Sequence, residues 1–233
     1  MKKIKLTLIA IFIATFSFGQ EVLFEEDVLA DTLISKKGPN RKHFYHFFIS
    51  YGFIAGESEG AGSDISYGLS NNVEFGFRYK LKVCNFYSIG CQALINTDVF
   101  HLKQLDSKTL PDTTQYDKEK LTNDNLSFGV YNRFNFGKRG NYIGNFLDVG
   151  AYGDWRFYSK HCVKDKISTG EMVKISTTHL NYLEDFNYGV YAQIGINRYV
   201  VYAKYRLSDI FLSTYSYSEL PRITVGLQIG FHK

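Results

Sequence analysis

Residues 222–231 read RITVGLQIGF, and the strict alternation of side chains in this stretch decides the fold class. One face carries Ile223, Val225, Leu227, Ile229 and Phe231, and the other carries the intervening arginine, threonine, glycines and glutamine. A period of two is that of a β-strand with one apolar face. Residues 73–81, VEFGFRYKL, show the same alternation, so the pattern is not confined to one segment.

Alternation of this kind recurs along the chain and predicts eight strands. They cover residues 43–55, 66–83, 86–101, 125–136, 142–158, 180–196, 199–212 and 221–232. Each is longer than the usual strand of about 5–6 residues and reaches the roughly 9–11 residues that a tilted strand needs to cross a bilayer. Short turns alternate with long polar connections, at 56–65, 102–124, 159–179 and 213–220. The sequence therefore predicts an all-β fold: a transmembrane antiparallel up-and-down β-barrel of eight strands, with short periplasmic turns and longer extracellular loops.

The composition excludes several other classes of protein. Aromatic residues make up 17% of the 233 residues and charged residues 21%, with only 3 prolines, which is not the profile of a disordered, collagen-like or coiled-coil chain. The mean hydropathy is -0.19, and after residue 20 no stretch approaches the roughly 18–20 apolar residues of a spanning helix. A polytopic helical membrane protein is therefore excluded.

The N-terminal residues predict a signal peptide. Three lysines precede an apolar run from Leu6 to Phe16, and Ser17 and Gly19 form a cleavage site before Gln20. Cleavage would leave 24 Lys and Arg against 23 Asp and Glu, so a basic nucleic-acid-binding surface is not expected. We predict three parts: a signal peptide (1–19), a periplasmic N-terminal arm (20–42) that forms a solvated tail, and the barrel domain (43–233).

The polar face of the strands distinguishes a membrane barrel from a soluble one. Seven of the eight predicted strands place a glycine there, namely Gly52, Gly76, Gly90, Gly129, Gly150, Gly189 and Gly226. Glycine weakens a solvent-facing strand, but small residues leave space for large neighbours in a crowded eight-stranded lumen. We therefore expect the polar face to point inward and the apolar face to contact lipid. The predicted lipid face comprises Phe47, Ile49, Phe75, Phe77, Ile89, Ala93, Phe128, Val130, Leu147, Val149, Val190, Ala192, Val201, Ala203, Val225 and Leu227.

Charged residues on the inward face form the candidate lumen network. Its members are Glu74, Arg78, Lys80, Asp98, Arg133, Asp148, Asp154, Arg156, Asp185, Lys204, Arg206 and Arg222, accompanied by Tyr131, Tyr152 and Tyr191. Five acids and seven bases are close enough in number to pair, and unpaired buried charge is costly. We expect a filled lumen, with a narrow pore for small solutes as the alternative.

A signal peptide, glycine-spaced strands and a Phe-containing last strand together resemble the outer-membrane β-barrel families of Bacteroidetes, including the PorT-like group. The architecture is also similar to small eight-stranded enterobacterial barrels. The resemblance covers about residues 43–233 and implies location in the outer membrane of a Gram-negative bacterium. Membership of the PorT-like group would imply an accessory role near an envelope or secretion complex.

Residues able to carry chemistry are few. Cys84, Cys91 and Cys162 are expected to be free thiols, and no set of metal ligands has the required spacing. A hydrolytic or lipid-modifying enzyme at the rim, built from Ser159 with His161 or His101, remains an alternative that needs these groups within hydrogen-bond reach.

The predicted role is structural or interactive, not enzymatic, with no catalytic, cofactor-binding or metal site. The expected contacts are outer-membrane lipid, and envelope proteins through the loops or the arm. We expect a monomer that binds no nucleic acid.

Overall fold

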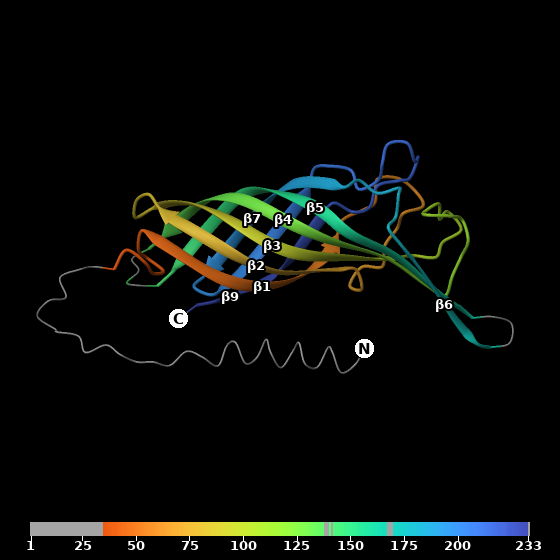
Figure 1. Ribbon diagram of the computed structural model, residues 1–233, viewed down its shortest axis with the longest axis horizontal. Helices are drawn as coiled ribbons and strands as arrows, with labels where there is room; N and C mark the ends of the chain where they lie inside the picture. The colour runs from red at the N-terminus through yellow and green to blue at the C-terminus, as the bar shows by residue number, and fades with distance from the viewer. Residues whose placement is uncertain (1–34, 138–139, 141, 167–169, 233) are drawn as a thin grey trace, which may run out of the picture. The chain divides into compact units, whose positions relative to one another are not determined.

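The computed structural model describes residues 35–137, 140, 142–166 and 170–232 (Figure 1). Within these residues the regular structure is entirely β, so they contain no helix that could span a membrane. The strands are β1 (His43–Ala55), β2 (Asn71–Lys82), β3 (Tyr87–Leu102), β4 (Lys118–Phe136), β5 (Asn145–Lys166), β6 (Met172–Thr178), β7 (Phe186–Ile196), β8 (Tyr199–Arg206) and β9 (Ile223–Phe231).

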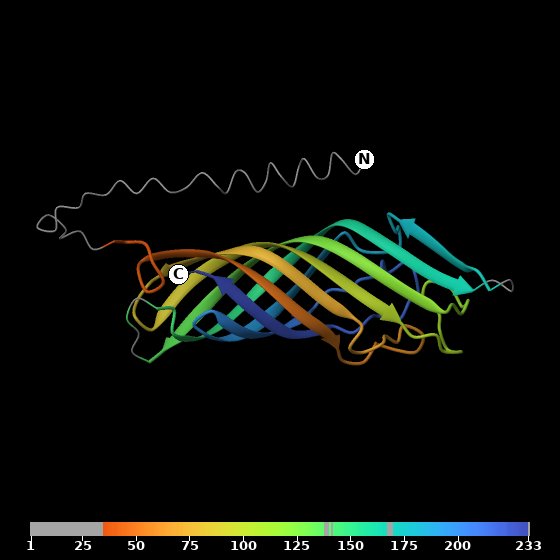
Figure 2. The same cartoon turned by 90° about the horizontal axis from the view of Figure 1, so that it is seen from below.

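Eight of the strands close into a ring. From β1 to β5, and from β7 to β9, each strand pairs antiparallel with the next along the chain. In addition, β5 pairs with β7, and β9 returns to β1. The remaining strand, β6, pairs only with the far end of β5, so these two strands form a hairpin that projects beyond the ring (Figures 1 and 2). The predicted eight-stranded antiparallel up-and-down barrel is confirmed.

The strand boundaries differ from the prediction mainly at the end of the barrel where the long connections lie, called here the loop end. Residues 66–70, 180–185 and 207–212 were expected in strands but lie in connections. Conversely, β4 begins at Lys118, β5 runs on to Lys166, and β6 lies inside a stretch predicted as loop. The β4 and β5 extensions carry charged side chains on both faces, which conceals them in the sequence. The predicted signal peptide and most of the predicted arm fall outside the described residues.

The two faces of the ring differ as the alternation predicts. In β1, β2 and β7, buried and exposed residues alternate along the strand. The residues of the predicted lipid face are exposed, except Ala93 and Leu147, which are partly exposed. Polar and glycine residues therefore fill the inside of the ring, and the apolar side chains point outward.

The short connections lie at the opposite end of the ring, called here the turn end. They include residues 83–86 and 197–198.

Interior tyrosines pack over glycines on neighbouring strands. Gly90 of β3 lies directly opposite Tyr131 of β4, and Tyr131 lies opposite Gly150 of β5. Gly189 of β7 likewise lies directly opposite Tyr152 of β5. An aromatic ring laid over a strand glycine fills the space that a side chain would otherwise take. The inward glycines therefore make room for the rings that fill the lumen.

Replacing Gly90 with alanine is expected to destabilise the barrel by about 1–3 kcal/mol, because the added carbon overpacks a filled interior. An ideal Cβ there would lie 2.3 Å from Cζ of Tyr131 and 2.4 Å from the backbone oxygen of Tyr79, which cannot move independently. Urea unfolding of the refolded barrel measures the effect. Gly140→Ala is the matched control, since the nearest atom to its Cβ is 4.0 Å away. Equal unfolding midpoints for the two variants would contradict the packing described.

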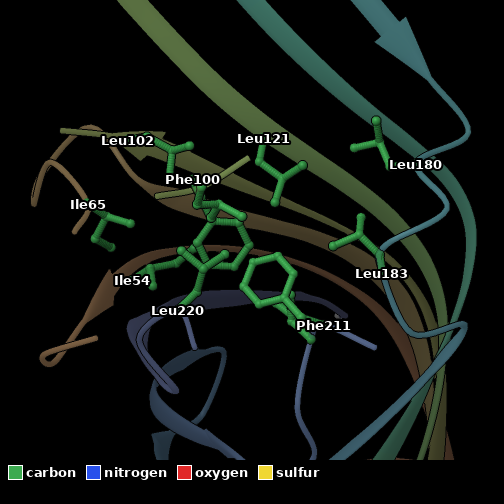
Figure 3. Close-up of a cluster of buried hydrophobic side chains, with 11 residues drawn as sticks. Ile54, Ile65, Phe100, Leu102, Leu121, Leu180, Leu183, Phe211 and Leu220 are labelled. Carbon is green, nitrogen blue, oxygen red and sulfur yellow. The ribbon is translucent and has the colours of Figure 1, made fainter. Parts of the chain in front are cut away.

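Apolar side chains close both ends of the ring. At the loop end, one buried cluster gathers residues from strands and connections alike (Figure 3): Ile54, Ile65, Phe100, Leu102, Leu110, Leu121, Leu180, Leu183, Ile210, Phe211 and Leu220. At the turn end, Phe44, Ile143, Phe146 and Val200 form a second cluster. The lumen is therefore bounded by apolar material on both sides.

Candidate functional site

A fully buried ion pair in the lumen joins β4 to β5. Arg133 and Asp148 lie directly opposite each other in the strand register. Nε and Nη2 of Arg133 donate to Oδ1 and Oδ2 of Asp148, both at 2.7 Å, and the side chain of Asp148 is 0% exposed. The guanidinium also stacks on the Phe146 ring at 3.6 Å. Two parallel bonds of this kind fix both the position and the plane of the pair.

Arg78 of β2 extends this contact across the lumen. Its Nη1 lies 3.9 Å from Oδ2 of Asp148. Its Nη2 donates to side-chain oxygens of Gln92 at 2.5 Å, Gln193 at 3.2 Å and Gln228 at 3.4 Å, which belong to three different strands. One carboxylate and three amides thus surround two arginines. We call this group of residues the arginine layer.

A second group, nearer the loop end, has the opposite balance of charge. Nζ of Lys204 donates to Oε1 of Glu74 at 2.7 Å, and Asp98 and Asp154 lie in the same region. Amides cross-link these carboxylates: Asn72 donates to Asp98 at 2.8 Å, and Asn96 to Asp154 at 3.2 Å. The lumen therefore holds an acidic layer, formed by Glu74, Asp98 and Asp154 around Lys204, on the loop-end side of the arginine layer.

The lumen contains a small cavity near the loop end. A cavity of about 40 Å³ lies below the loop-end cluster, lined by residues that include Asp98, Asn125, Asp154 and Arg206. That volume holds a water molecule or two, not a continuous column.

At the turn end, the ammonium group of Lys80 donates to the backbone oxygen of Pro39. Residues 36–42, placed in the predicted arm, thus lie against the turn end of the barrel.

Four of the predicted network residues lie at the loop-end rim. Arg206 donates to Glu219 at 2.9 Å, and Arg222 to both Glu59 and Asp209 at 2.6 Å. The hydrogen bond from Arg222 holds the pKa of Glu59 below its usual value. Arg156 donates to Asp185 at 2.6 Å.

The structure thus assigns the predicted network residues to three places. Glu74, Arg78, Asp98, Arg133, Asp148, Asp154 and Lys204 line the lumen, Lys80 lies at the turn end, and Arg156, Arg206, Arg222 and Asp185 lie at the rim. The carboxylate of Asp185 is 85% exposed and therefore outside the interior. Its predicted strand began six residues too early, which carried the inward alternation into a connection. The amides Gln92, Gln193 and Gln228 were not predicted, because their sequence signal is only an inward polar position.

A separate buried network orders the long connection between β3 and β4. Both carboxylate oxygens of Glu119 are used: Lys108 Nζ lies at 2.6 Å, Gln104 donates at 2.8 Å, and His161 Nε2 lies at 2.7 Å. Burial raises the pKa of Glu119, but the hydrogen bonds from His161, Lys108 and Gln104 outweigh it, and the pKa falls below its usual value. The sequence predicted a long polar connection here, whereas Lys108 is buried.

The side chains considered for a rim enzyme make other contacts. Oγ of Ser159 accepts a hydrogen bond from the backbone N–H of Leu180 at 3.0 Å. His161 faces inward and contacts Glu119, as described. His101 pairs across the sheet with Lys120, on the outward face of the strands. The structure therefore places His101 and His161 on opposite faces of the sheet.

Comparison with known proteins adds little to these observations. No protein-family model matches the chain, and no curated protein matches it either. Among solved structures, the chain is similar to Ail, the attachment invasion locus protein of Yersinia pestis, in its complex with the heparin analogue sucrose octasulfate. The match has 14% sequence identity and a TM-score of 0.30, and covers 80% of this chain and 94% of Ail. The barrel described above therefore rests on its own strand pairing.

Proposed function

We propose that this protein is an integral outer-membrane β-barrel with a closed lumen, whose role is structural or interactive and not enzymatic. Its short turns face the periplasm, and its long connections, with the hairpin of β5 and β6, face outward. The observation that carries the proposal is the inverted arrangement of side chains around the ring. A soluble barrel of this size has an apolar interior, whereas here the charges are inside and the apolar residues outside.

The geometry of the exposed apolar surface supports the membrane setting. The shortest strands of the ring include β8, with 8 residues, and β9, with 9, close to the length that crosses a bilayer at a tilt. Because the ring is closed, the spanning part has no free strand edge, as a hydrocarbon environment requires. Outward aromatic residues such as Tyr199 and Phe231 at the turn end, and Trp155 and Phe157 towards the loop end, occupy the positions of interfacial girdles.

The closed lumen favours a plug over a pore. Apolar clusters cover both ends, and paired charges fill the middle. We therefore expect no discrete conductance steps when the purified protein is added to a planar bilayer. We also expect the folded barrel to migrate differently on a gel before and after boiling, and to fractionate with the outer membrane. Regular conductance steps would overturn the closed-lumen proposal, and an unchanged migration would overturn the barrel itself.

An interaction role is favoured by the outer hairpin. All seven residues of β6 are exposed, and its outer edge pairs with no other described strand. Such an edge offers backbone donors and acceptors to a partner. The resemblance to PorT-like barrels of Bacteroidetes leads us to propose an envelope complex as that partner. Co-purification of envelope proteins in mild detergent is the expected result, with recovery lost when β6 is deleted. Isolation as a lone chain would count against it.

A further inference from the structure

Beyond the apolar surface, the outward side of the loop-end extension is strongly basic. We call it the cationic face, and its members are His101 of β3, Lys118 and Lys120 of β4, Lys160, Lys164 and Lys166 of β5, and Lys174 of β6. The register fixes its orientation. Leu121 lies in the buried loop-end cluster, so its neighbour Lys120, on the opposite side of the strand, points away from the interior.

Three of these lysines form a row across three strands. Lys118 lies directly opposite Lys164, and Lys164 lies directly opposite Lys174. Like charges at directly opposed positions destabilise a sheet. None of the three makes an ion pair within the part of the chain that the structure describes. The row therefore carries an electrostatic cost that an anionic ligand would relieve.

The lysines line a groove. Its volume is about 290 Å³, and it is lined by His101, Lys118, Glu119, Lys120, Cys162, Lys164 and Lys174. The carboxylate of Glu119 is already bound to Lys108 and His161, so it does not neutralise the groove. Burial and then the nearby charges of Lys120 and Lys118 lower the pKa of His101. The local potential is therefore positive.

The strands that carry the cationic face hold two other acids close to it, Asp124 and Asp165. Asp124 lies at its lower edge and accepts a hydrogen bond from Thr97 at 2.7 Å. Asp165, next to Lys164, lies on the opposite side of β5, because adjacent residues of a strand alternate between faces. The groove thus lacks an internal counter-ion among the described residues.

The position of the cationic face identifies what can reach it. Leu126 and Trp155 are paired outward residues near the loop-end limit of the apolar surface. Lys160 pairs with Thr122, four residues farther along β4. With a strand rise of about 3.3 Å and a tilt near 40°, Lys160 lies about 10 Å above that pair. The cationic face therefore begins close to the height of the lipid head groups and continues outward from them.

We propose that the cationic face binds the phosphorylated head group of a glycolipid in the outer leaflet. The acyl chains of this lipid would lie along the apolar surface below, and its phosphates would accept hydrogen bonds from the lysines. Lysine ammonium groups bind phosphate as compact point charges. We favour a membrane lipid over a soluble anion because the basic groove and the lipid-facing surface are continuous on one side of β3, β4 and β5. This inference rests on the proposed function.

The test uses the full chain, refolded in mild detergent and titrated with lipopolysaccharide that retains its lipid A phosphates. Native mass spectrometry measures the bound fraction. The triple variant Lys118→Gln, Lys164→Gln, Lys174→Gln is expected to bind about tenfold or more weakly, since each lysine near an anionic surface contributes separately. The matched control, Lys36→Gln, Lys42→Gln, Arg198→Gln, removes the same charge from exposed positions at the turn end and is expected to bind like the wild type.

Two further binding experiments identify the ligand of the groove. Dephosphorylated lipopolysaccharide is expected to lose the difference between wild type and triple variant. The soluble phosphorylated core oligosaccharide is expected to compete poorly, and equal competition would assign the groove to a soluble anion and overturn the lipid assignment. Equal binding of intact lipopolysaccharide to the wild type and the triple variant would overturn the inference altogether.

The stability of the triple variant separates this inference from the proposed function. Without glycolipid, its urea midpoint is expected to equal or exceed that of the wild type, because lysine repulsion is removed. A lower midpoint would show that these lysines support the fold themselves and would count against a binding role. Failure of the proposed function would appear instead as absent heat-modifiable migration in the wild type.

Discussion

Replacing Asp148 with asparagine is expected to lower the free energy of unfolding by about 3–5 kcal/mol, the usual cost of breaking a fully buried ion pair. The carboxylate is 0% exposed and forms ion pairs with both Arg133 and Arg78. Asparagine keeps the shape but leaves two buried guanidinium groups without a counter-charge. Urea unfolding of the barrel refolded into lipid vesicles, followed by tryptophan fluorescence, measures the loss.

The matched control is the same substitution at Asp185. That carboxylate also pairs with an arginine at 2.6 Å, but it is 85% exposed, so Asp185→Asn is expected to cost about 0–1 kcal/mol. The double variant Arg133→Met with Asp148→Leu is expected to recover part of the loss, because Arg78 alone is then left without a counter-charge. Equal effects at Asp148 and Asp185 would mean that the lumen is hydrated and not packed.

The sequence predicted the ring and its inside-out character because both depend on one simple quantity, the parity of residue position. In a strand of known direction, an inward Arg78 places Lys80 and Glu74 inward as well, with no knowledge of the partners. The need to neutralise buried charge predicts that the inward acids and bases form ion pairs. It does not predict which acid pairs with which base. Arg133 and Asp148 meet because β4 and β5 pair in one particular register, which the sequence does not state.

The loop end was less predictable for a different physical reason. The apolar cluster there draws on single residues such as Leu110, Leu180 and Leu220, each isolated within a polar connection. An isolated apolar residue has no period, so it signals neither a strand nor a helix. Likewise, the extension of β4 begins Lys-Glu-Lys, with charges on both faces, and reads as loop. Its stability comes from the neighbouring strands and from the burial of Glu119, both of which are tertiary features.

The most direct test of the membrane setting is a charge on the outward face. Val130 lies near the middle of the apolar part of the outward row of β4, which runs from Leu126 to Phe136, and is 64% exposed. If this row faces hydrocarbon, Val130→Arg is expected to cost about 2–4 kcal/mol, the penalty for arginine near the bilayer midplane on the lipid face of a barrel. If the barrel were soluble, the same arginine would extend into water and cost almost nothing. Urea unfolding from lipid vesicles measures the difference.

The control for this prediction is Ile175→Arg on β6, an outer hairpin residue that is 57% exposed. Because β6 projects beyond the ring, we expect that arginine to remain in water and leave the unfolding midpoint unchanged. The two positions have nearly equal exposure and the same change in charge, so a difference between them reports the surrounding medium alone. A large cost at Val130 with none at Ile175 would place the ring, but not the hairpin, in lipid. Two costs near zero would remove the outer membrane from the proposal and, with it, the basis for a lipid head group at the cationic face.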